Sequence, residues 1–267
     1  MYTAPFQYMR PASLAEAEKL FANSGDAKYL AGGQTLIPTM KQRLAAPSML
    51  IDLKRIASLA FIRREGATLR IGAGTTHATV AASPDVKAAI PALAVLAGLI
   101  GDPAVRHRGT LGGSIANNDP AADYPAAVLS LGASIKTTRR TIAADDFFIG
   151  MFSTALEDGE IVTEIAFPIP KRAGYAKYPN PASRYAMVGV FVAEFANAVR
   201  VAVTGAGPCV FRVAEMEQAF KRTFSPESVS GIAISPEGLN SDLFGSAEYR
   251  AHLVTVMAKR AVDAAMV

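Results

Sequence analysis

Two pairs of adjacent glycines are the residues whose type and surroundings best suit ligand chemistry. The first pair lies in the segment Ala31–Thr35 (AGGQT) and the second in Thr110–Ser114 (TLGGS). Glycine permits a positive φ and has no side chain to keep a ligand away, so consecutive backbone N–H groups can converge on an anion. Each pair alone is more typical of an ordinary turn. Two such loops together would suit the two phosphates of a dinucleotide.

Short polar side chains are concentrated directly after the second pair, between Ala116 and Pro125. By physical reasoning alone, they are best explained as Asx turns and as the N-cap of a helix over 125–131. The functional alternative is that a carboxylate such as Asp123, held by a rigid turn, accepts hydrogen bonds from hydroxyl or ring N–H groups of a bound molecule.

Composition removes several other chemistries. The chain has one cysteine, Cys209, and three histidines that lie far apart, His77, His107 and His252. One thiolate cannot hold an iron–sulfur cluster, and no metal site is expected. The net charge of +4 is spread along the chain, which does not indicate a nucleic-acid-binding surface. With 51% hydrophobic and 19% charged residues, the chain is typical of a soluble globular protein.

No transmembrane segment or signal peptide is expected. The longest apolar stretch, residues 88–100, is interrupted by Pro91 and Gly98 and is shorter than the roughly 20 residues that span a bilayer. It is better explained as a buried helix. The N-terminus has no apolar core after a basic start. We therefore expect a cytoplasmic protein, with contact to the inner face of a membrane only through partners.

The first glycine pair lies within a predicted β-α-β unit, which a helix precedes. A capping box at Ser13–Glu16 begins a helix over 13–24, and Gly25 ends it. A strand over 28–30, a helix over 36–45 and a strand over 49–53 follow. The first pair therefore falls between a strand and a helix.

The remainder of the chain mixes helices and strands without a regular repeat. The segment Pro168–Pro181 contains four prolines and a glycine and is predicted to be a domain-joining loop without regular structure. We expect domains over 1–56, 57–170 and 171–267. The expected elements are strands over 68–71, 133–137, 141–142, 161–167, 184–195, 199–204 and 209–213, and helices from 83, over 125–131 and over 247–266. The segment 104–118 is rich in Gly, Asn and Arg.

Three ordered motifs carry a specific resemblance: AGGQT at 31–35, RGTLGGSIANNDPAADYPA at 108–126 and ASRYAMVGV at 182–190. Together they resemble the FAD-binding medium subunit of the molybdenum hydroxylase family, which includes carbon monoxide dehydrogenase and xanthine dehydrogenase. The resemblance implies an α+β fold: a two-subdomain FAD-binding fold of the vanillyl-alcohol oxidase type, followed by a C-terminal α+β domain with antiparallel sheet and helices.

The resemblance also implies which residues form the site. The backbone amides of both glycine loops would face the diphosphate, Asp123 would bond to the ribityl or ring portion, and Lys177 would reach the flavin from the C-terminal domain. Tyr185 would lie over the isoalloxazine as the one catalytic residue. The full cofactor-binding set is Leu30, Ala31, Gly32, Gly33, Gln34, Thr35, Leu36, Ile37, Ile100, Thr110, Leu111, Gly112, Gly113, Ser114, Asn117, Asp123, Ile161, Val162, Lys177 and Tyr185.

Three positions depart from the family pattern. Thr35 replaces the more usual serine and keeps the hydroxyl group. His107 stands where asparagine is common, and we interpret it as a surface-loop residue. The segment 178–181 (YPNP) lengthens the spacing after Lys177.

The function implied by the resemblance is electron transfer through FAD. A small partner subunit would carry two [2Fe-2S] clusters, a large partner would carry the molybdenum cofactor, and the complex would be a dimer of heterotrimers with an external electron acceptor. The alternatives are a free-standing FAD-dependent oxidoreductase of the same wider fold and a nucleotide-binding module without redox turnover. The organic substrate stays open, because its pocket would lie on the molybdenum partner. The acceptor stays open too: quinone, cytochrome, NAD and oxygen all occur with related scaffolds, and the sequence has no nicotinamide-binding fingerprint.

Overall fold

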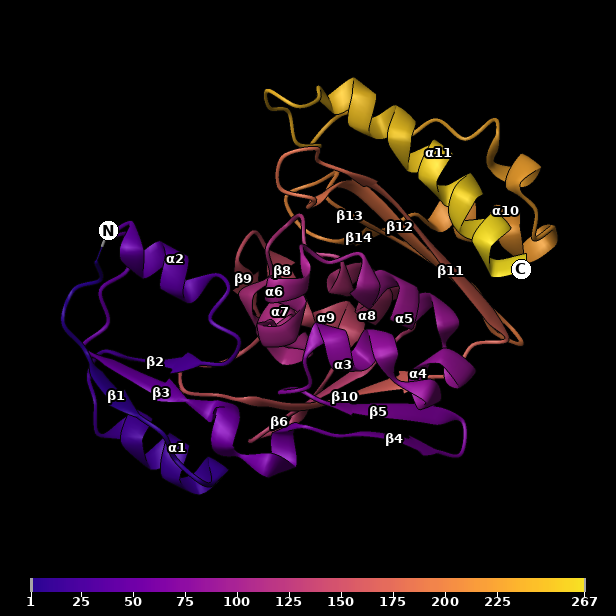
Figure 1. The fold of residues 1–267 in the computed structure, drawn as a ribbon. Helices are drawn as coiled ribbons and strands as arrows, with labels where there is room; N and C mark the ends of the chain where they lie inside the picture. The colour runs from indigo at the N-terminus through magenta and orange to yellow at the C-terminus, as the bar shows by residue number, and fades with distance from the viewer. Residues whose placement is uncertain (1, 267) are drawn as a thin grey trace.

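Three main β-sheets follow one another along the chain in the computed structural model, which describes residues 2–266 (Figure 1). The first sheet has the order β1-β3-β2 and is parallel throughout. Helix α1 packs on one face of this sheet and α2 on the other (Figure 1). The elements are β1 (Gln7–Met9), α1 (Leu14–Ala22), β2 (Ala27–Leu30), α2 (Leu36–Lys41) and β3 (Met49–Asp52).

The predicted capping box begins α1. Ser13 Oγ accepts from Glu16 N–H, and Glu16 Oε2 accepts from Ala12 N–H. The first bond satisfies an amide that the first helical turn leaves free, and the second ties the Glu16 side chain to the residue before the cap. The predicted β-α-β unit is present, although α2 ends at Lys41 and not at 45.

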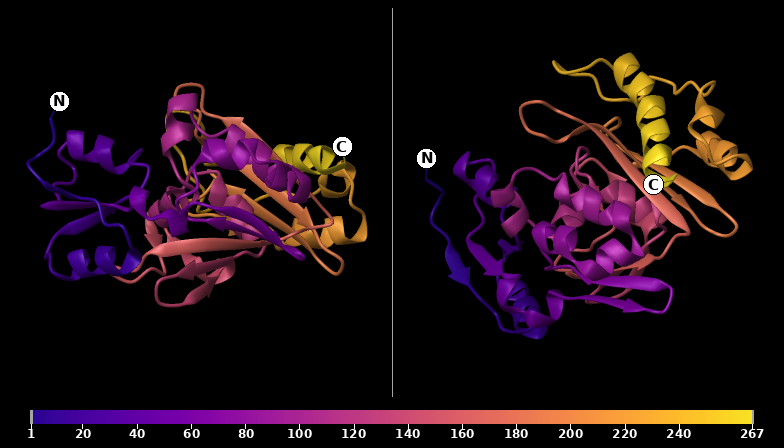
Figure 2. Two further views of the ribbon diagram at one scale, coloured as in Figure 1. Left: turned by 60° about the horizontal axis from the view of Figure 1, so that its bottom comes forward. Right: turned by 45° about the vertical axis from the view of Figure 1, so that its right-hand side comes forward.

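The second sheet is antiparallel with the order β4-β5-β10-β6-β7, and six short helices lie against one side of it (Figures 1 and 2). The strands are β4 (Ile62–Glu65), β5 (Thr68–Gly72), β6 (Ser134–Thr137), β7 (Thr141–Ala143) and β10 (Val162–Pro168). The helices are α3 (His77–Ala82), α4 (Pro84–Ala89), α5 (Pro91–Gly98), α6 (Pro103–Arg108), α7 (Leu111–Asn117) and α8 (Tyr124–Ser130). A short helix and a two-stranded hairpin complete this part: α9 (Ala144–Phe147), β8 (Phe148–Gly150) and β9 (Ser153–Thr154).

The third sheet is antiparallel with the order β11-β12-β13-β14. Its elements are β11 (Arg172–Pro179), β12 (Ala186–Glu194), β13 (Val199–Thr204) and β14 (Phe211–Arg212), followed by α10 (Ala214–Arg222) and α11 (Ala247–Met266). Helix α11 covers one face, and α5 and α8 lie between the other face and the second sheet (Figure 1). One hydrophobic core therefore contains Ile71 and Ile165 of the second sheet, Leu93 and Leu129 of the helices, and Phe191 of the third sheet.

The mixed helix and strand content confirms the predicted α+β class. The prediction for Pro168–Pro181 was wrong, because Arg172–Pro179 forms β11 and pairs along its length with β12. The prolines mark the ends of strands: Pro168 ends β10, and Pro179 ends β11. Strand β11 lies at the sheet edge, where a missing N–H is tolerated.

Residues 104–118, for which the sequence analysis names no helix or strand, form most of α6 and α7. Each helix begins with a side-chain cap, Asp102 to Val105 N–H and Thr110 to Gly113 N–H. The glycines obscured the helical pattern of α7. Each of the three predicted domain ranges contains one main sheet, and their exact bounds stay a prediction. None of the helices within residues 2–266 combines the length and apolarity needed to cross a bilayer.

Candidate functional site

The two glycine loops, far apart in sequence, meet in space. A Cβ atom added to Gly32 would lie 2.5 Å from the carbonyl oxygen of Arg108 and 2.6 Å from Cα of Gly109. A Cβ atom added to Gly113 would lie 3.7 Å from Cβ of Ala31. The first loop therefore packs directly on the backbone that leads into the second loop, and this approach leaves no room for a side chain at position 32.

Both loops line a single cavity of about 1340 Å³. This volume exceeds the range of about 300–1,000 Å³ typical of small-ligand pockets, as an extended dinucleotide would require. Three of the predicted residues, Ile37, Leu111 and Lys177, are not on its wall. The predicted residues that do line it are Leu30, Ala31, Gly32, Gly33, Gln34, Thr35, Leu36, Ile100, Thr110, Gly112, Gly113, Ser114, Asn117, Asp123, Ile161, Val162 and Tyr185.

The first loop offers free hydrogen-bond donors. Within residues 2–266, none of the backbone N–H groups of Gly32, Gly33, Gln34 and Thr35 donates to an acceptor. Gly33 has φ of +72°, a conformation that side chains oppose. The Thr35 hydroxyl does not cap α2. Four adjacent amides without an acceptor at a cavity wall are available to donate to a bound ligand.

The glycine amides of the second loop are hydrogen-bonded within the protein. The N–H of Gly112 donates to Ala73 O at 2.8 Å, and the N–H of Gly113 donates to Thr110 Oγ1 at 3.1 Å. Both amides are therefore hydrogen-bonded within the protein, and their role at the diphosphate stays a prediction. The N–H of Thr110 has no acceptor within residues 2–266 and is the free donor of this loop.

Asp123 is held by a buried polar network. Its carboxylate accepts from Tyr175 Oη at 2.6 Å and lies 2.9 Å from Lys177 Nζ. Burial raises the pKa of Asp123, and the Lys177 charge and the bonds from Tyr175 and Lys177 oppose that rise. Asp123 N-caps no helix through its side chain, although it precedes α8. The side-chain N-cap of the structural alternative is therefore absent, whereas its Asx turn is present at Asp119, whose Oδ1 accepts from Ala121 N–H at 2.9 Å. Asp123 lines the cavity.

Lys177 lies behind Asp123. Its Nζ donates to Asp123 and to Leu99 O at 3.1 Å, and only 3% of its side chain is exposed. An ammonium group has three donors, and the three recorded contacts are to two Asp123 oxygens and one carbonyl oxygen. Lys177 thus contributes to the site through Asp123.

Tyr185 stands on the loop between β11 and β12, with 44% of its surface exposed on the cavity wall. Asn180 organises this loop: its Oδ1 accepts from Ala182 N–H at 2.9 Å, and its N–H donates to Tyr185 O at 2.7 Å. Burial, together with the charges of Asp119 and Asp123, raises the pKa of Tyr185. The phenol therefore keeps its proton at neutral pH and is a hydrogen-bond donor.

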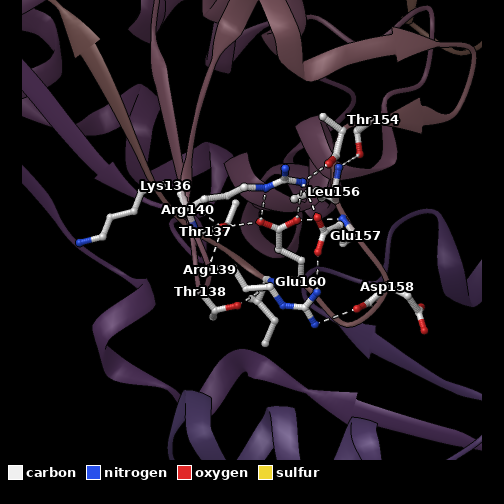
Figure 3. A network of polar contacts seen from close by, with 12 residues as sticks. Lys136, Thr137, Thr138, Arg139, Arg140, Thr154, Leu156, Glu157, Asp158 and Glu160 are labelled. Atoms are coloured by element: carbon white, nitrogen blue, oxygen red, sulfur yellow. Dashed lines mark hydrogen bonds and ion pairs between the residues drawn. The ribbon is translucent and has the colours of Figure 1, made fainter.

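The turn Glu157–Glu160 also lines the cavity, and a polar network holds it in place (Figure 3). The buried Glu160 carboxylate accepts from Thr137 Oγ1 at 2.6 Å, from Arg140 at 3.2 Å and from Glu157 N–H at 2.8 Å. Burial acts to raise the pKa of Glu160, but these bonds and the Arg140 charge hold it below its ordinary value. Tyr29 of β2, which also lines the cavity, donates from its Oη to Gly159 O of this turn at 3.2 Å.

Glu160→Gln should loosen this turn. The amide keeps the shape but loses the negative charge beside Arg140, and hydrogen bonds to charged groups are worth about 1.5–3 kcal/mol. We expect the free energy of unfolding to fall by about 1–2 kcal/mol at pH 7. Because the folded pKa is depressed, the difference between the two proteins should shrink as pH falls below the ordinary value of a glutamate. Urea denaturation at pH 7 and pH 4 measures both effects, and equal differences at the two pH values would contradict the assignment.

Several residues that line the cavity are not identified as site residues by the sequence analysis. The Asp158-Gly159 pair is a turn signal that could have identified the 157–160 turn. His77, by contrast, lies in an unremarkable stretch, and only packing brings it to the wall. His107 was interpreted as a surface-loop residue; it is exposed, but it belongs to α6, and it lies on the cavity rim. The main additions are Phe21, Tyr29, Thr76, His77, Arg108, Gly109, Asp119, Glu157, Asp158, Gly159, Ser183 and Arg184.

Comparisons with known proteins identify the family of this chain. Residues 4–170 match the family model described as the FAD binding domain in molybdopterin dehydrogenase. The chain is 38% identical to the carbon monoxide dehydrogenase medium chain of Hydrogenophaga pseudoflava, over 97% of this chain and 96% of that one. It is 36% identical to the nicotine 6-hydroxylase medium subunit of Paenarthrobacter nicotinovorans, over 96% and 95% of the two chains.

Solved structures give the same result. A chain of carbon monoxide dehydrogenase from Oligotropha carboxidovorans superposes with a TM-score of 0.92 at 34% identity, with 99% of each chain covered. A chain of quinoline 2-oxidoreductase from Pseudomonas putida 86 superposes with a TM-score of 0.88 at 30% identity, over 100% and 99% of the two chains. The chain therefore belongs to the FAD-binding medium subunits of the molybdenum hydroxylase family and is an oxidoreductase component.

Proposed function

We propose that this chain is the electron-transfer flavin subunit of a molybdenum-containing hydroxylase or dehydrogenase. It takes electrons from the [2Fe-2S] clusters of a small partner subunit and passes them to an external acceptor. The organic substrate reacts on a large partner subunit that carries the molybdenum cofactor. The complex is a cytoplasmic dimer of heterotrimers. The observation that carries this proposal is the meeting of the two glycine loops at the wall of one large cavity.

The residues present fit FAD. The free amides of Gly32–Thr35 and of Thr110 supply donors for two phosphates, and the close approach at Gly32 holds the two loops together. Ile161 and Val162 give the end near Tyr29 an apolar surface for adenine. Ile100, Asp123 and Tyr185 line the part assigned to the ribityl chain and ring. When bound, FAD would accept electrons singly and release two together.

The protein's own part is to bind FAD, to orient its ring and to adjust its reduction potential. Asp123, fixed by Tyr175 and Lys177, presents a carboxylate that accepts from a hydroxyl or ring N–H group. Tyr185 presents a protonated phenol that donates. Such hydrogen bonds set the electronic properties of a bound cofactor, while the chemistry belongs to the cofactor.

The decisive experiment is coexpression of the tagged chain with its candidate large and small subunits. We expect about one FAD per chain, copurification of both partners, and reduction of the flavin by organic substrate only in the complex. If the isolated chain reduces a dye rapidly from a small substrate, the free-standing oxidoreductase is the correct alternative. If the purified chain has no flavin absorbance and gains none with added FAD, the proposal fails at its first step.

Tyr185→Phe should leave FAD binding unchanged while altering the reduction potential or the reactivity of the bound flavin. The ring and its packing stay while the donated hydrogen bond is lost, so FAD content should equal that of the parent. The reduction potential of the bound flavin, or the rate of its oxidation by the acceptor, should change by an amount equivalent to about 0.5–1.5 kcal/mol. Spectroelectrochemical titration measures the potential. If neither property moves, Tyr185 serves only as a partly buried aromatic residue.

A further inference from the structure

His77 is a buried histidine that no step of the proposed function uses. It begins α3, and only 5% of its surface is exposed. Its Nδ1 atom is buried and has no hydrogen-bond partner within residues 2–266. Burial, and secondarily the positive charge of Arg106, lowers the pKa of His77 to about 4. The imidazole is therefore neutral at neutral pH, and its contribution to the site is one of shape.

The His77 ring lies against the second glycine loop. A Cβ atom added to Gly109 would be 2.5 Å from His77 Nε2 and 2.8 Å from Cδ2. The backbone is fixed at the same point, because His77 N–H donates to Gly109 O at 3.0 Å. The ring also packs on the fully buried Tyr124, with ring centroids 5.3 Å apart. The imidazole cannot retreat from Gly109 without displacing the core.

Gly109 in turn supports the first glycine loop. Its Cα atom lies 2.6 Å from the position that a Cβ atom of Gly32 would take. Tyr124, His77, Gly109 and Gly32 thus form a continuous column from the hydrophobic core to the loop with the free amides. Close-packed interiors transmit a displacement of one member to the next.

We propose that the His77 ring sets the separation between the two glycine loops and is a positioning residue for the diphosphate part of the FAD site. The inference rests on the proposed function, because it assigns the cradle to the FAD diphosphate. Gly109 has φ of −59° and ψ of 141°, which alanine adopts readily. The obstacle to a side chain at position 109 is therefore steric, and its nearest atoms belong to His77.

Reciprocal substitutions test this directly. Gly109→Ala should push the loop away from the ring, and His77→Ala should leave the loop unsupported. Each is expected to weaken FAD binding about tenfold, the size typical of a moderate packing change. In the double variant the new methyl group occupies part of the space that the ring leaves, so affinity should return to within about threefold of the parent. This recovery is the coupling that a double-mutant cycle isolates.

The probes are FAD, ADP and riboflavin, titrated into full-length protein from which the cofactor has been removed. FAD and ADP carry the diphosphate and should lose affinity together in the single variants. Riboflavin has no phosphate, and its affinity should not change. His77→Gln places an amide nitrogen near the former Nε2 position and should keep FAD affinity within about threefold, which provides a test if His77→Ala folds poorly.

Val80→Ala is the matched control, because Val80 is fully buried in the same helix and is not among the atoms nearest Gly109. It should lower the melting temperature while leaving FAD and ADP affinity unchanged. The proposal would be overturned if the loss of FAD affinity in the double variant equalled or exceeded the product of the losses in the two single variants. It would also be overturned if the single variants lost riboflavin affinity to the same extent as FAD affinity. A parent protein that binds no FAD at all would instead overturn the proposed function.

Discussion

Gly32→Ala should remove most FAD from the purified chain, although the substitution adds a single methyl group. The new Cβ would stand 2.5 Å from Arg108 O and 2.6 Å from Gly109 Cα, and both are backbone atoms that no rotamer change can move. The two loops must therefore separate. Overpacking of this kind costs about 1–3 kcal/mol, which corresponds to about a tenfold to hundredfold loss of affinity if it falls on binding. Flavin absorbance per chain and a fluorescence titration measure the loss.

Gly25→Ala is the control for this prediction. Nothing lies within 4 Å of its added Cβ, and Gly25 is not among the glycines with positive φ. FAD content should match that of the parent. If Gly32→Ala also keeps its FAD, the two loops do not grip a common ligand, and the assignment of the cavity to FAD loses its main support.

Lys177→Met should be the substitution with the largest effect on stability. Lys177 and Asp123 form an ion pair in which each side chain is only 3% exposed. Removal of one partner leaves a buried charge without compensation, which typically costs about 3–5 kcal/mol. Urea denaturation of the chain without cofactor measures this difference in free energy of unfolding. Because Lys177 acts through Asp123, FAD affinity should also fall.

The stability lost in Lys177→Met should depend on pH in a direction that can be predicted. Burial already raises the pKa of Asp123, and without the ammonium group this rise is unopposed by the lysine charge. In the folded variant Asp123 would then hold a proton more tightly than in the unfolded chain, so folding is favoured at low pH and stability falls as pH rises. The variant should therefore lie closer to the parent at pH 5 than at pH 8.

Arg139→Met provides the comparison. Arg139 pairs with Glu157 at 3.0 Å, but 44% and 59% of the two side chains are exposed. Exposed pairs contribute about 0–1 kcal/mol. An equal loss of stability in Arg139→Met and Lys177→Met would show that the Asp123–Lys177 pair has no special role in the fold.

The sequence was most informative where local rules decide the structure. The capping box at Ser13–Glu16 and the strand before Gly32 were predicted from spacing, because each depends on neighbouring residues. The order of motifs was enough to identify the family. The prediction of a loop over Pro168–Pro181 failed, because prolines at the ends of an edge strand and prolines in a loop give the same sequence pattern.

The site was less predictable, because its details depend on contacts between distant segments. The amide of Gly112 is occupied by Ala73 O, and no local pattern signals that bond. Lys177 lies on β11, and only the fold shows that its ammonium group contacts Asp123 and Leu99 O. His77 owes its position to the packing of α3 against Gly109 and Tyr124. Partners chosen by tertiary structure cannot be read from spacing alone.

The placement of α5 and α8 between two sheets bears on how the chain can be divided. The same core holds side chains of the second sheet, of both helices and of Phe191 in the third sheet. A fragment ending at residue 170 would expose the apolar face of those helices to water, and a fragment beginning there would expose the matching face of its sheet. The two halves should therefore melt in one transition, and neither should be obtainable as a stable protein by truncation.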